Sequence, residues 1–181
     1  MANKIEIPLD VCTRLINHGP VSLLTSAYMD KRNVMALAWL MPVSHTPRYL
    51  AIALPQKRYS YELIEKSKEF VLNIPPVALK QLVLNCGEVT GRKVDKFKEH
   101  KIKTLPAKKV GAPLIEDCVA HLECKIINEI KAGDHQILVA EIVAASANEG
   151  VVSEKGIVNV EKAQMLHHLG GAYFGVMEKE V

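Results

Sequence analysis

Hydroxyl and cationic side chains follow directly on two apolar segments in the first third of the sequence. Segments 34–40 and 49–54 are apolar nearly throughout, and Arg58 and Ser60 come just after the second one. A guanidinium is a planar fork that grips two phosphate oxygens, and a helix N-terminus adds free N–H groups to such an anion site. A flat aromatic cofactor with a phosphate needs an apolar wall beside cations, so we expect a flavin here.

Further cations lie downstream and give the anion site two more candidates. Residues 92–109 hold eight lysines and arginines against two acidic residues. Lys96 and Arg92 are the next candidates for a phosphate, with Asp95 orienting one of them. Two plainer interpretations stay open, because the basic stretch could be a solvated face and Arg58 could simply cap a surface turn.

Histidines are the candidates for proton transfer. His135 follows a Gly133-Asp134 turn, and histidine is the side chain that ordinarily titrates near neutral pH, so it can pass protons or bind a metal ion. A histidine that merely ends a strand is the alternative. His45 could approach the same site from its own loop.

The four cysteines favour free thiols over a metal site or disulfides. Cys12, Cys86, Cys118 and Cys124 include no Cys-x-x-Cys pair, and their spacing matches no standard zinc pattern. Cys118 and Cys124 are six residues apart, so we expect both on the same face of one strand. We expect no metal.

Composition places the chain among ordinary globular proteins. Of its 181 residues 49% are hydrophobic and 24% charged, and the net charge is only +3. No nucleic-acid motif accompanies the basic stretch, and no run reaches the length of a membrane span. The first residues lack the apolar core of a signal peptide, so we expect a cytoplasmic protein that forms one domain over 1–181.

The residues above must be positioned by short elements in the first half of the chain. Hydrophobic patterning and breakers predict strands over 21–26, 34–40, 49–54 and 70–74, a turn over 28–33, and helices over 8–17, 61–67, 77–85 and 95–100. Ser60 is the expected N-cap of the second helix, and Gly87 is suited to end the third.

The clearest strand signal comes late. From Ala120 to Lys131 the even positions are mostly apolar and the odd ones mostly polar, which predicts a strand with one buried and one wet face. Ala132-Gly133-Asp134 supplies turn chemistry, and 135–147 runs back as the partner strand. With few helices and no Gly-x-Gly-x-x-Gly loop, the fold class is mainly β (α+β), a β-barrel with a few short helices.

Several ordered motifs resemble the flavin reductase-like, FMN-binding split-barrel family, which includes flavoredoxins and a ferric reductase. They cover nearly the whole chain and run Asn33-Val-Met-Ala-Leu-Ala-Trp39, Pro42-Val-Ser44, Arg58-Tyr-Ser-Tyr-Glu-Leu-Ile64, Glu69-Phe-Val-Leu-Asn-Ile-Pro75, Cys86-Gly87, Gly91-Arg92 with Asp95-Lys-Phe97, Gly133-Asp-His135 and His168-Leu-Gly-Gly-Ala-Tyr173. The hydroxyl at Ser60 is commonly Thr in the family, which keeps the hydrogen bond.

The resemblance implies a homodimer of Greek-key split barrels, each binding one FMN near the subunit interface. The implied cofactor-binding residues are Trp39, Leu40, Met41, Pro42, Val43, Ser44, Arg58, Ser60, Tyr61, Cys86, Gly87, Arg92, Asp95 and Lys96. Segment 39–44 would offer main-chain groups to the pyrimidine edge of the ring, and Trp39 could instead be a plain core aromatic. His135 takes the family position near the exposed face of the flavin. His167, His168 and Tyr173 are expected at the dimer interface, with a hydrogen bond to the cofactor as the alternative.

Three functions follow from these expectations. The first is an oxidoreductase that takes hydride from NADH or NADPH and passes electrons to free flavin, a ferric chelate or a protein acceptor, with His135 as the catalytic residue. The second is a flavoredoxin-type electron carrier that a partner protein reduces. The third is a non-redox module that reuses the barrel for another ligand such as haem.

Overall fold

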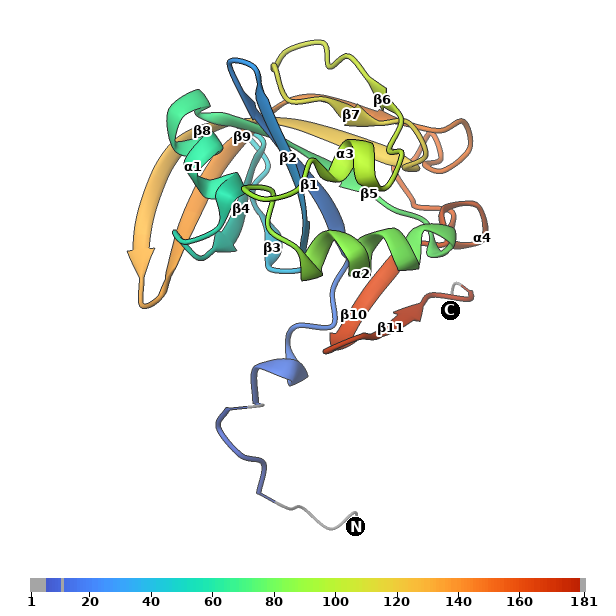
Figure 1. Cartoon of the computed structure of the whole chain (residues 1–181). Helices are drawn as coiled ribbons and strands as arrows, with labels where there is room; N and C mark the ends of the chain where they lie inside the picture. Colours follow the sequence, from blue (N-terminus) through green and yellow to red (C-terminus); the bar gives the residue numbers. More distant parts are fainter. Residues whose placement is uncertain (1–5, 11, 180–181) are drawn as a thin grey trace.

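One antiparallel sheet of seven strands forms the body of the molecule (Figure 1). The computed structural model describes residues 6–10 and 12–179. In sheet order the strands are β2 (Lys31–Leu37), β1 (Ser22–Tyr28), β5 (Glu69–Ile74), β8 (Ala120–Ala132), β9 (His135–Ala147), β4 (Tyr49–Leu54) and β3 (Leu40–Ser44). Every neighbouring pair is antiparallel, as the mainly β prediction requires.

Short helices and two small hairpins surround this sheet. The helices are α1 (Tyr59–Ser67), α2 (Lys80–Glu88), α3 (Lys96–Glu99) and α4 (Val160–Ala163), with 3-10 turns η1 (Cys12–Leu15) and η2 (Val77–Leu79). The hairpins pair β6 (Thr104–Leu105) with β7 (Leu114–Ile115), and β10 (Leu166–Gly170) with β11 (Tyr173–Val176). No helix in 6–10 and 12–179 combines the length and the apolar character that a membrane crossing needs.

The chain passes from one edge of the sheet to the other at Ala38 and Trp39. The strand expected over 34–40 ends at Leu37, and Leu40 already belongs to β3, which lies at the opposite edge. The carbonyl oxygen of Trp39 accepts a hydrogen bond from the Ala53 N–H at 3.0 Å, which fastens this crossing to β4. The sheet therefore curls round until its two edge strands are joined by two residues.

The long hairpin β8–β9 forms where the sequence predicted it, but part of the face of β8 that was expected to be exposed is buried. Gly133 has a φ of 61° and turns the chain between the strands. His121 and Glu123 were expected on the wet face but are buried. The chain around residues 108–115 covers them: Glu123 accepts from the Lys108 and Lys109 N–H groups at 3.0 and 2.6 Å, and His121 Nε2 lies 2.9 Å from the Ile115 carbonyl oxygen.

Three expectations about the helices differ from the structure. The α1 helix begins at Tyr59 with Arg58 as its N-cap, so Ser60 lies in the first turn and is not the cap. Gly87 lies inside α2, which continues to Glu88. The helix expected over 8–17 includes position 11, which lies outside the described residues, and the described part holds only the 3-10 turn η1.

Apolar side chains on the two faces of the sheet form separate clusters. Leu24 belongs to the cluster inside the curled sheet, while its neighbour Leu23 packs outward with Val83 and Cys86 of α2. Cys118 and Cys124 were expected on one face of one strand, but Cys118 precedes β8 and belongs to the outer cluster, whereas Cys124 belongs to the inner one. The outer cluster fixes α2 across β2, which places the helix at the site described next.

Candidate functional site

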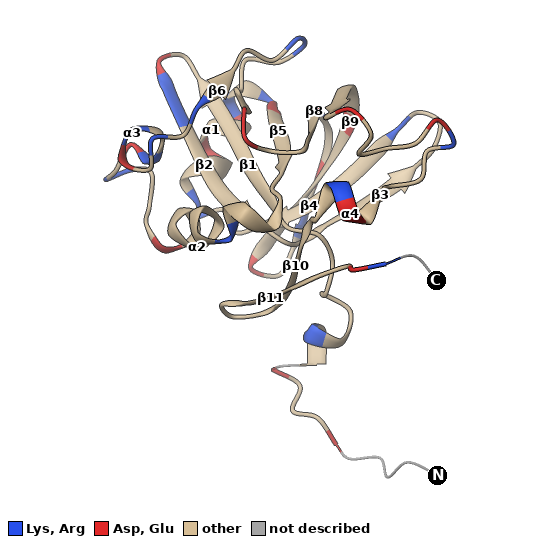
Figure 2. Ribbon diagram, turned by 90° about the vertical axis from the view of Figure 1, so that its right-hand side faces the viewer, with Lys and Arg blue, Asp and Glu red and all other residues tan. Residues whose placement is uncertain are grey.

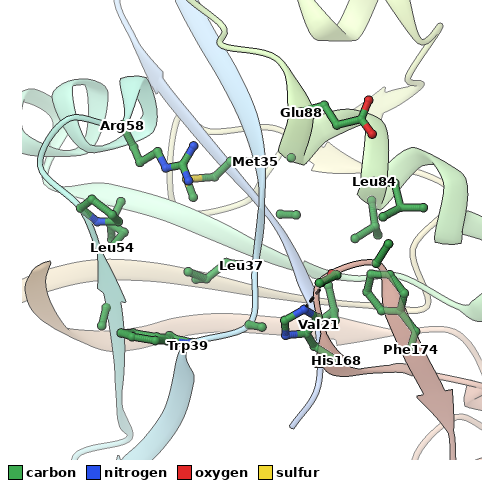
Figure 3. A pocket seen from close by; sticks show the side chains of 18 of the residues that line it. Val21, Met35, Leu37, Trp39, Leu54, Arg58, Leu84, Glu88, His168 and Phe174 are labelled. Carbon is green, nitrogen blue, oxygen red and sulfur yellow. Dashed lines mark hydrogen bonds between the residues drawn. The ribbon is translucent and has the colours of Figure 1, made fainter. Parts of the chain in front are cut away.

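A pocket of about 500 Å³ opens between β2, β4, α2 and the β10–β11 turn (Figure 3). Its walls are mostly apolar and include Met35, Leu37, Leu54, Leu84 and Phe174. Trp39 lies at one end, Arg58 reaches in from the start of α1, and His168 lies on the opposite side from Arg58. An apolar slot of this size suits a planar ring system.

A second, more polar pocket of about 360 Å³ adjoins the first. Five residues line both pockets: Met35, Ala36, Arg58, Gly87 and Glu88. The second pocket adds the side chains of Lys57, Ser60, Thr90 and Lys96. The two pockets together offer an apolar slot that leads into a cationic, hydroxyl-bearing recess.

Lys96 is the most unusual residue of the polar pocket because it is a buried cation. Only 3% of the residue is exposed, and its ammonium donates to the carbonyl oxygens of Val34 and Cys86 at 2.8 and 2.6 Å. Burial lowers the pKa of Lys96, the Cys86 thiol raises it, and the charge of Arg58 lowers it further. In 6–10 and 12–179 neither Lys96 nor Arg58 forms an ion pair with a carboxylate. Two cations thus face one recess, which favours an anion between them.

The floor of the polar pocket is built from Asn33, Ser60 and Gly91. The amide of Asn33 donates to the Ser60 hydroxyl at 2.9 Å, and both residues are buried. A Cβ on Gly91 would lie 2.9 Å from Cδ1 of Tyr59 and still closer to the Asn33 amide, so only glycine lets this loop approach so closely. The recess is therefore a fitted cradle of backbone and small polar groups.

An indole and an imidazole stack at the mouth of the apolar pocket. The Trp39 and His135 rings have centroids 4.7 Å apart and an interplanar angle of 24°. His135 Nδ1 lies 2.7 Å from the Asp134 carboxylate, and this hydrogen bond lowers the pKa of Asp134. Because Nδ1 is engaged, Nε2 is the nitrogen of His135 that is left to exchange a proton with a bound ligand.

Asn17 fixes the indole from the other side. In the amide orientation that satisfies both of its polar atoms, Asn17 accepts from Trp39 Nε1 at 2.6 Å and donates to the Ala38 carbonyl oxygen at 3.3 Å. The stack is thus held from two directions, so Trp39 is a wall of the pocket rather than an ordinary core aromatic.

The structure brings together seven of the predicted site residues and separates the others. Trp39, Arg58, Ser60, Gly87, Lys96 and His135 line one or both pockets, and Cys86 lines the polar one. Leu40, Met41, Pro42, Val43 and Ser44 form the edge strand β3 and line neither. The Tyr61 side chain points away, since its hydroxyl donates to Glu129 at 3.4 Å. Burial raises the pKa of the Cys86 thiol to about 11, so Cys86 acts through its carbonyl group and not as a thiolate.

The basic stretch 92–109 divides into parts with different surroundings. Arg92 donates to the Lys57 carbonyl oxygen at 3.0 Å and pairs with Glu62 at 3.2 Å, so it ties its loop to α1 and lines neither pocket. Asp95 caps α3 by accepting from the Phe97 and Lys98 N–H groups, and therefore orients neither Arg92 nor Lys96. The other lysines of the stretch are exposed. Blue and red segments adjoin at α3 (Figure 2), where Lys98 pairs with Asp95 at 3.7 Å, whereas Lys108 and Lys109 lie between β6 and β7.

Several residues of the site escaped the sequence analysis. Met35, Leu84 and Phe174 line the apolar pocket but were not proposed as site residues. His168 was expected at the dimer interface, with a hydrogen bond to the cofactor as the alternative, and it also lines this pocket. His45 is exposed on its loop and lines neither pocket. The described part of the chain contains no group of three or more His, Cys, Asp or Glu side chains arranged to hold a metal, and its cysteines are all free.

Comparison with known proteins agrees with this geometry. Residues 15–175 match the model of the flavin reductase like domain. The chain belongs to the flavin reductase-like domain family. Uncharacterized protein YddH of Escherichia coli (strain K12) is 36% identical, and the alignment covers 100% of this chain and 98% of YddH. These matches confirm the family that the sequence motifs indicated.

Two solved structures share this fold over nearly their whole length. Flavoredoxin from Methanosarcina acetivorans superposes with a TM-score of 0.87 at 27% identity, covering 99% of this chain and 94% of that one. An FMN-binding domain of a flavin reductases-like enzyme from Shewanella baltica OS155 gives a TM-score of 0.79 at 26% identity, covering 97% and 94%. The predicted mainly β split barrel is confirmed.

Proposed function

We propose that this flavin reductase-like protein binds FMN across the two adjoining pockets and uses it for electron transfer. The observation that carries the proposal is the pair of cations, Arg58 and Lys96, facing a recess continuous with an apolar slot. The ring would lie in the slot beside Trp39, and the phosphate would lie in the recess near Ser60 and the Gly91 loop. The similarity to an FMN-binding domain supports the choice of this flavin.

The protein's own residues would bind, orient and protonate rather than carry electrons. When bound, FMN supplies the electron-accepting and electron-donating chemistry. Arg58 and Lys96 hold the acidic end, the apolar walls exclude water from the ring, and His135 exchanges a proton through Nε2. We infer that NADH or NADPH is the electron donor, with free flavin, a ferric chelate or a protein as the acceptor.

The preparation itself tests this function. We expect the purified protein to be yellow, to release FMN on denaturation, and to lose its visible flavin absorbance when NADH or NADPH is added without oxygen. A colourless protein that takes up no FMN from an excess would contradict the proposal. Absorbance that stays unchanged with both nucleotides would favour the second candidate, an electron carrier reduced by a partner protein, which the similarity to flavoredoxin supports.

His135 is expected to affect turnover more than cofactor content. Replacing His135 by Ala removes the nitrogen that exchanges protons and leaves the phosphate recess intact, so the rate should fall by about 10²-fold while bound FMN stays near the wild-type level. Steady-state reductase assays and flavin absorbance measure the two effects. His45→Ala is the matched control, because His45 is exposed and lines neither pocket. Equal rates for wild type and His135→Ala would remove His135 from the reaction.

We infer that the chain forms one domain over 1–181 and pairs with a second copy through β3. Met41 and Val43 of this edge strand are 59% and 44% exposed, and an apolar hollow of about 370 Å³ lies beside them. Sedimentation equilibrium should give twice the monomer mass of 20.0 kDa. Met41→Lys should shift the protein toward monomer, whereas Met29→Lys, at the distant β1–β2 turn, should not. A wild-type monomer would contradict the pairing.

A further inference from the structure

One wall of the polar pocket is a short exposed segment between two helices. Residues 88–91, which we call the recess loop, line this pocket together with residues 57–60 around the start of α1. Val89 and Thr90 are exposed. Figure 1 shows the chain running from the end of α2 past α1 toward α3. Burial does not fix a segment of this kind, so its position depends on a few specific contacts.

Arg92 follows the recess loop directly and fastens it to the opposite wall. Its guanidinium donates to the Lys57 carbonyl oxygen at 3.0 Å and to the Glu62 carboxylate at 3.2 Å, and its central carbon lies 5.5 Å from the centre of the Tyr59 ring. Within the described ranges, 6–10 and 12–179, every hydrogen bond that joins segment 88–94 to segment 57–62 comes from Arg92. We call these contacts the Arg92 clasp.

The other end of the recess loop is held by a stronger tie. The buried ammonium of Lys96 donates to the Cys86 and Val34 carbonyl oxygens, which fastens the end of α2 to β2. The Arg92 clasp is different, because the Arg92 and Glu62 side chains are 46% and 38% exposed. Exposed ion pairs are weak and are screened by salt. The clasp is therefore the tie of the recess that opens most easily.

We propose that the Arg92 clasp sets how long the protein retains a phosphorylated flavin, because it holds the recess loop against α1 around the phosphate. This inference rests on the proposed function and deepens it. Arg92 lines neither pocket, so it is a positioning residue. The phosphate contacts Arg58 and Lys96, and Arg92 keeps the wall beside them in place. A closed clasp retains FMN, and an open one lets it exchange with free flavin.

The rate of flavin exchange tests the clasp. Isotopically labelled FMN or riboflavin is bound to wild type and to Arg92→Ala, and the loss of label into an excess of the same unlabelled flavin is followed with time. We expect Arg92→Ala to release FMN roughly fivefold faster than wild type, since one exposed tie is lost. Riboflavin release should not change, because riboflavin places no phosphate in the recess.

Two variants separate a clasp from a direct contact with the phosphate. Glu62→Gln should also speed FMN release, and it should have no further effect in an Arg92→Ala background. If Arg92 bound the phosphate itself, freeing it from Glu62 would not speed release. Lys66→Ala is the matched control, because Lys66 also pairs with Glu62, at 3.5 Å, but within α1. It should release FMN like wild type.

The outcomes distinguish this inference from the function on which it rests. A wild type that binds FMN, with FMN release unchanged in Arg92→Ala, would overturn the clasp and leave the FMN site standing. Riboflavin release accelerated by the same factor as FMN release would also overturn the clasp. A wild type that binds no FMN would overturn both. Should Arg92→Ala fail to fold, Glu62→Gln decides: faster release of FMN alone supports the clasp, and unchanged release overturns it.

Discussion

Replacing Arg58 by Ala should weaken FMN binding by about 1.5–3 kcal/mol, or roughly 10- to 150-fold, while riboflavin binding stays near the wild-type value. The guanidinium lines both pockets and has no carboxylate partner among residues 6–10 and 12–179, so its hydrogen bonds are available to a phosphate. Riboflavin lacks the phosphate and therefore reports only on the ring site. Isothermal titration with both flavins measures the difference.

The control for this experiment is a cation outside the recess. Lys93 is exposed and lines neither pocket, so Lys93→Ala should bind both flavins like wild type. Thermal unfolding of the apo forms checks that Arg58→Ala keeps its fold, because Arg58 also begins α1. An FMN affinity unchanged by Arg58→Ala would place the phosphate elsewhere, and an equal loss for riboflavin would mean that Arg58 supports the ring instead.

The free energy of unfolding should fall steeply as the pH rises above about 9. Burial raises the pKa of the Cys86 thiol to about 11 and of the Cys124 thiol to about 12, and it raises the pKa of Cys118 further still. A group whose folded pKa is raised keeps its full contribution below the unfolded pKa and loses it above, at about 1.4 kcal/mol per pH unit. The lowered pKa of Lys96 acts in the opposite direction. Three thiols outnumber one amine, so the net effect of raising the pH is a loss of stability.

Urea unfolding of the reduced protein at pH 8, 9 and 10 measures this loss. Cys124→Ala is the informative variant, since it removes one thiol and should reduce the slope by about 1.4 kcal/mol per pH unit. The cavity left by the substitution lowers stability at every pH, so the slope and not the absolute value is the readout. Constant stability between pH 9 and 10 would show that the thiols are not shielded as their burial implies.

Local sequence patterns predicted the helices and strands well, but they did not predict which other segments pack against them. The hairpin β8–β9 was visible because alternation and turn chemistry are properties of adjacent residues. The burial of His121 and Glu123 was not visible, because the chain that covers them is contributed by residues 108–115. The break at Ala38 likewise depends on where β4 lies, and β4 comes later in the sequence.

In the candidate site, too, the sequence predicted which side chains have suitable chemistry but not which contacts those side chains make. Arg58, Ser60 and Lys96 were proposed from their types and order, and they do share a recess. The ion pair of Arg92 with Glu62 and the helix cap formed by Asp95 satisfy those side chains locally, which no spacing in the sequence revealed. His168 was expected first at the dimer interface, because the sequence does not show that the β10–β11 turn folds back onto the pocket.

The assembly of the pocket from both ends of the chain constrains when it can be filled during synthesis. Val21 and Met35 leave the ribosome early, whereas His168 and Phe174 belong to the β10–β11 hairpin and follow every other wall. A growing chain has no complete slot until this hairpin docks against Gly19 and Val21 through its backbone hydrogen bonds. A flavin that fills the complete slot therefore binds only after the β10–β11 hairpin has been synthesised and has docked.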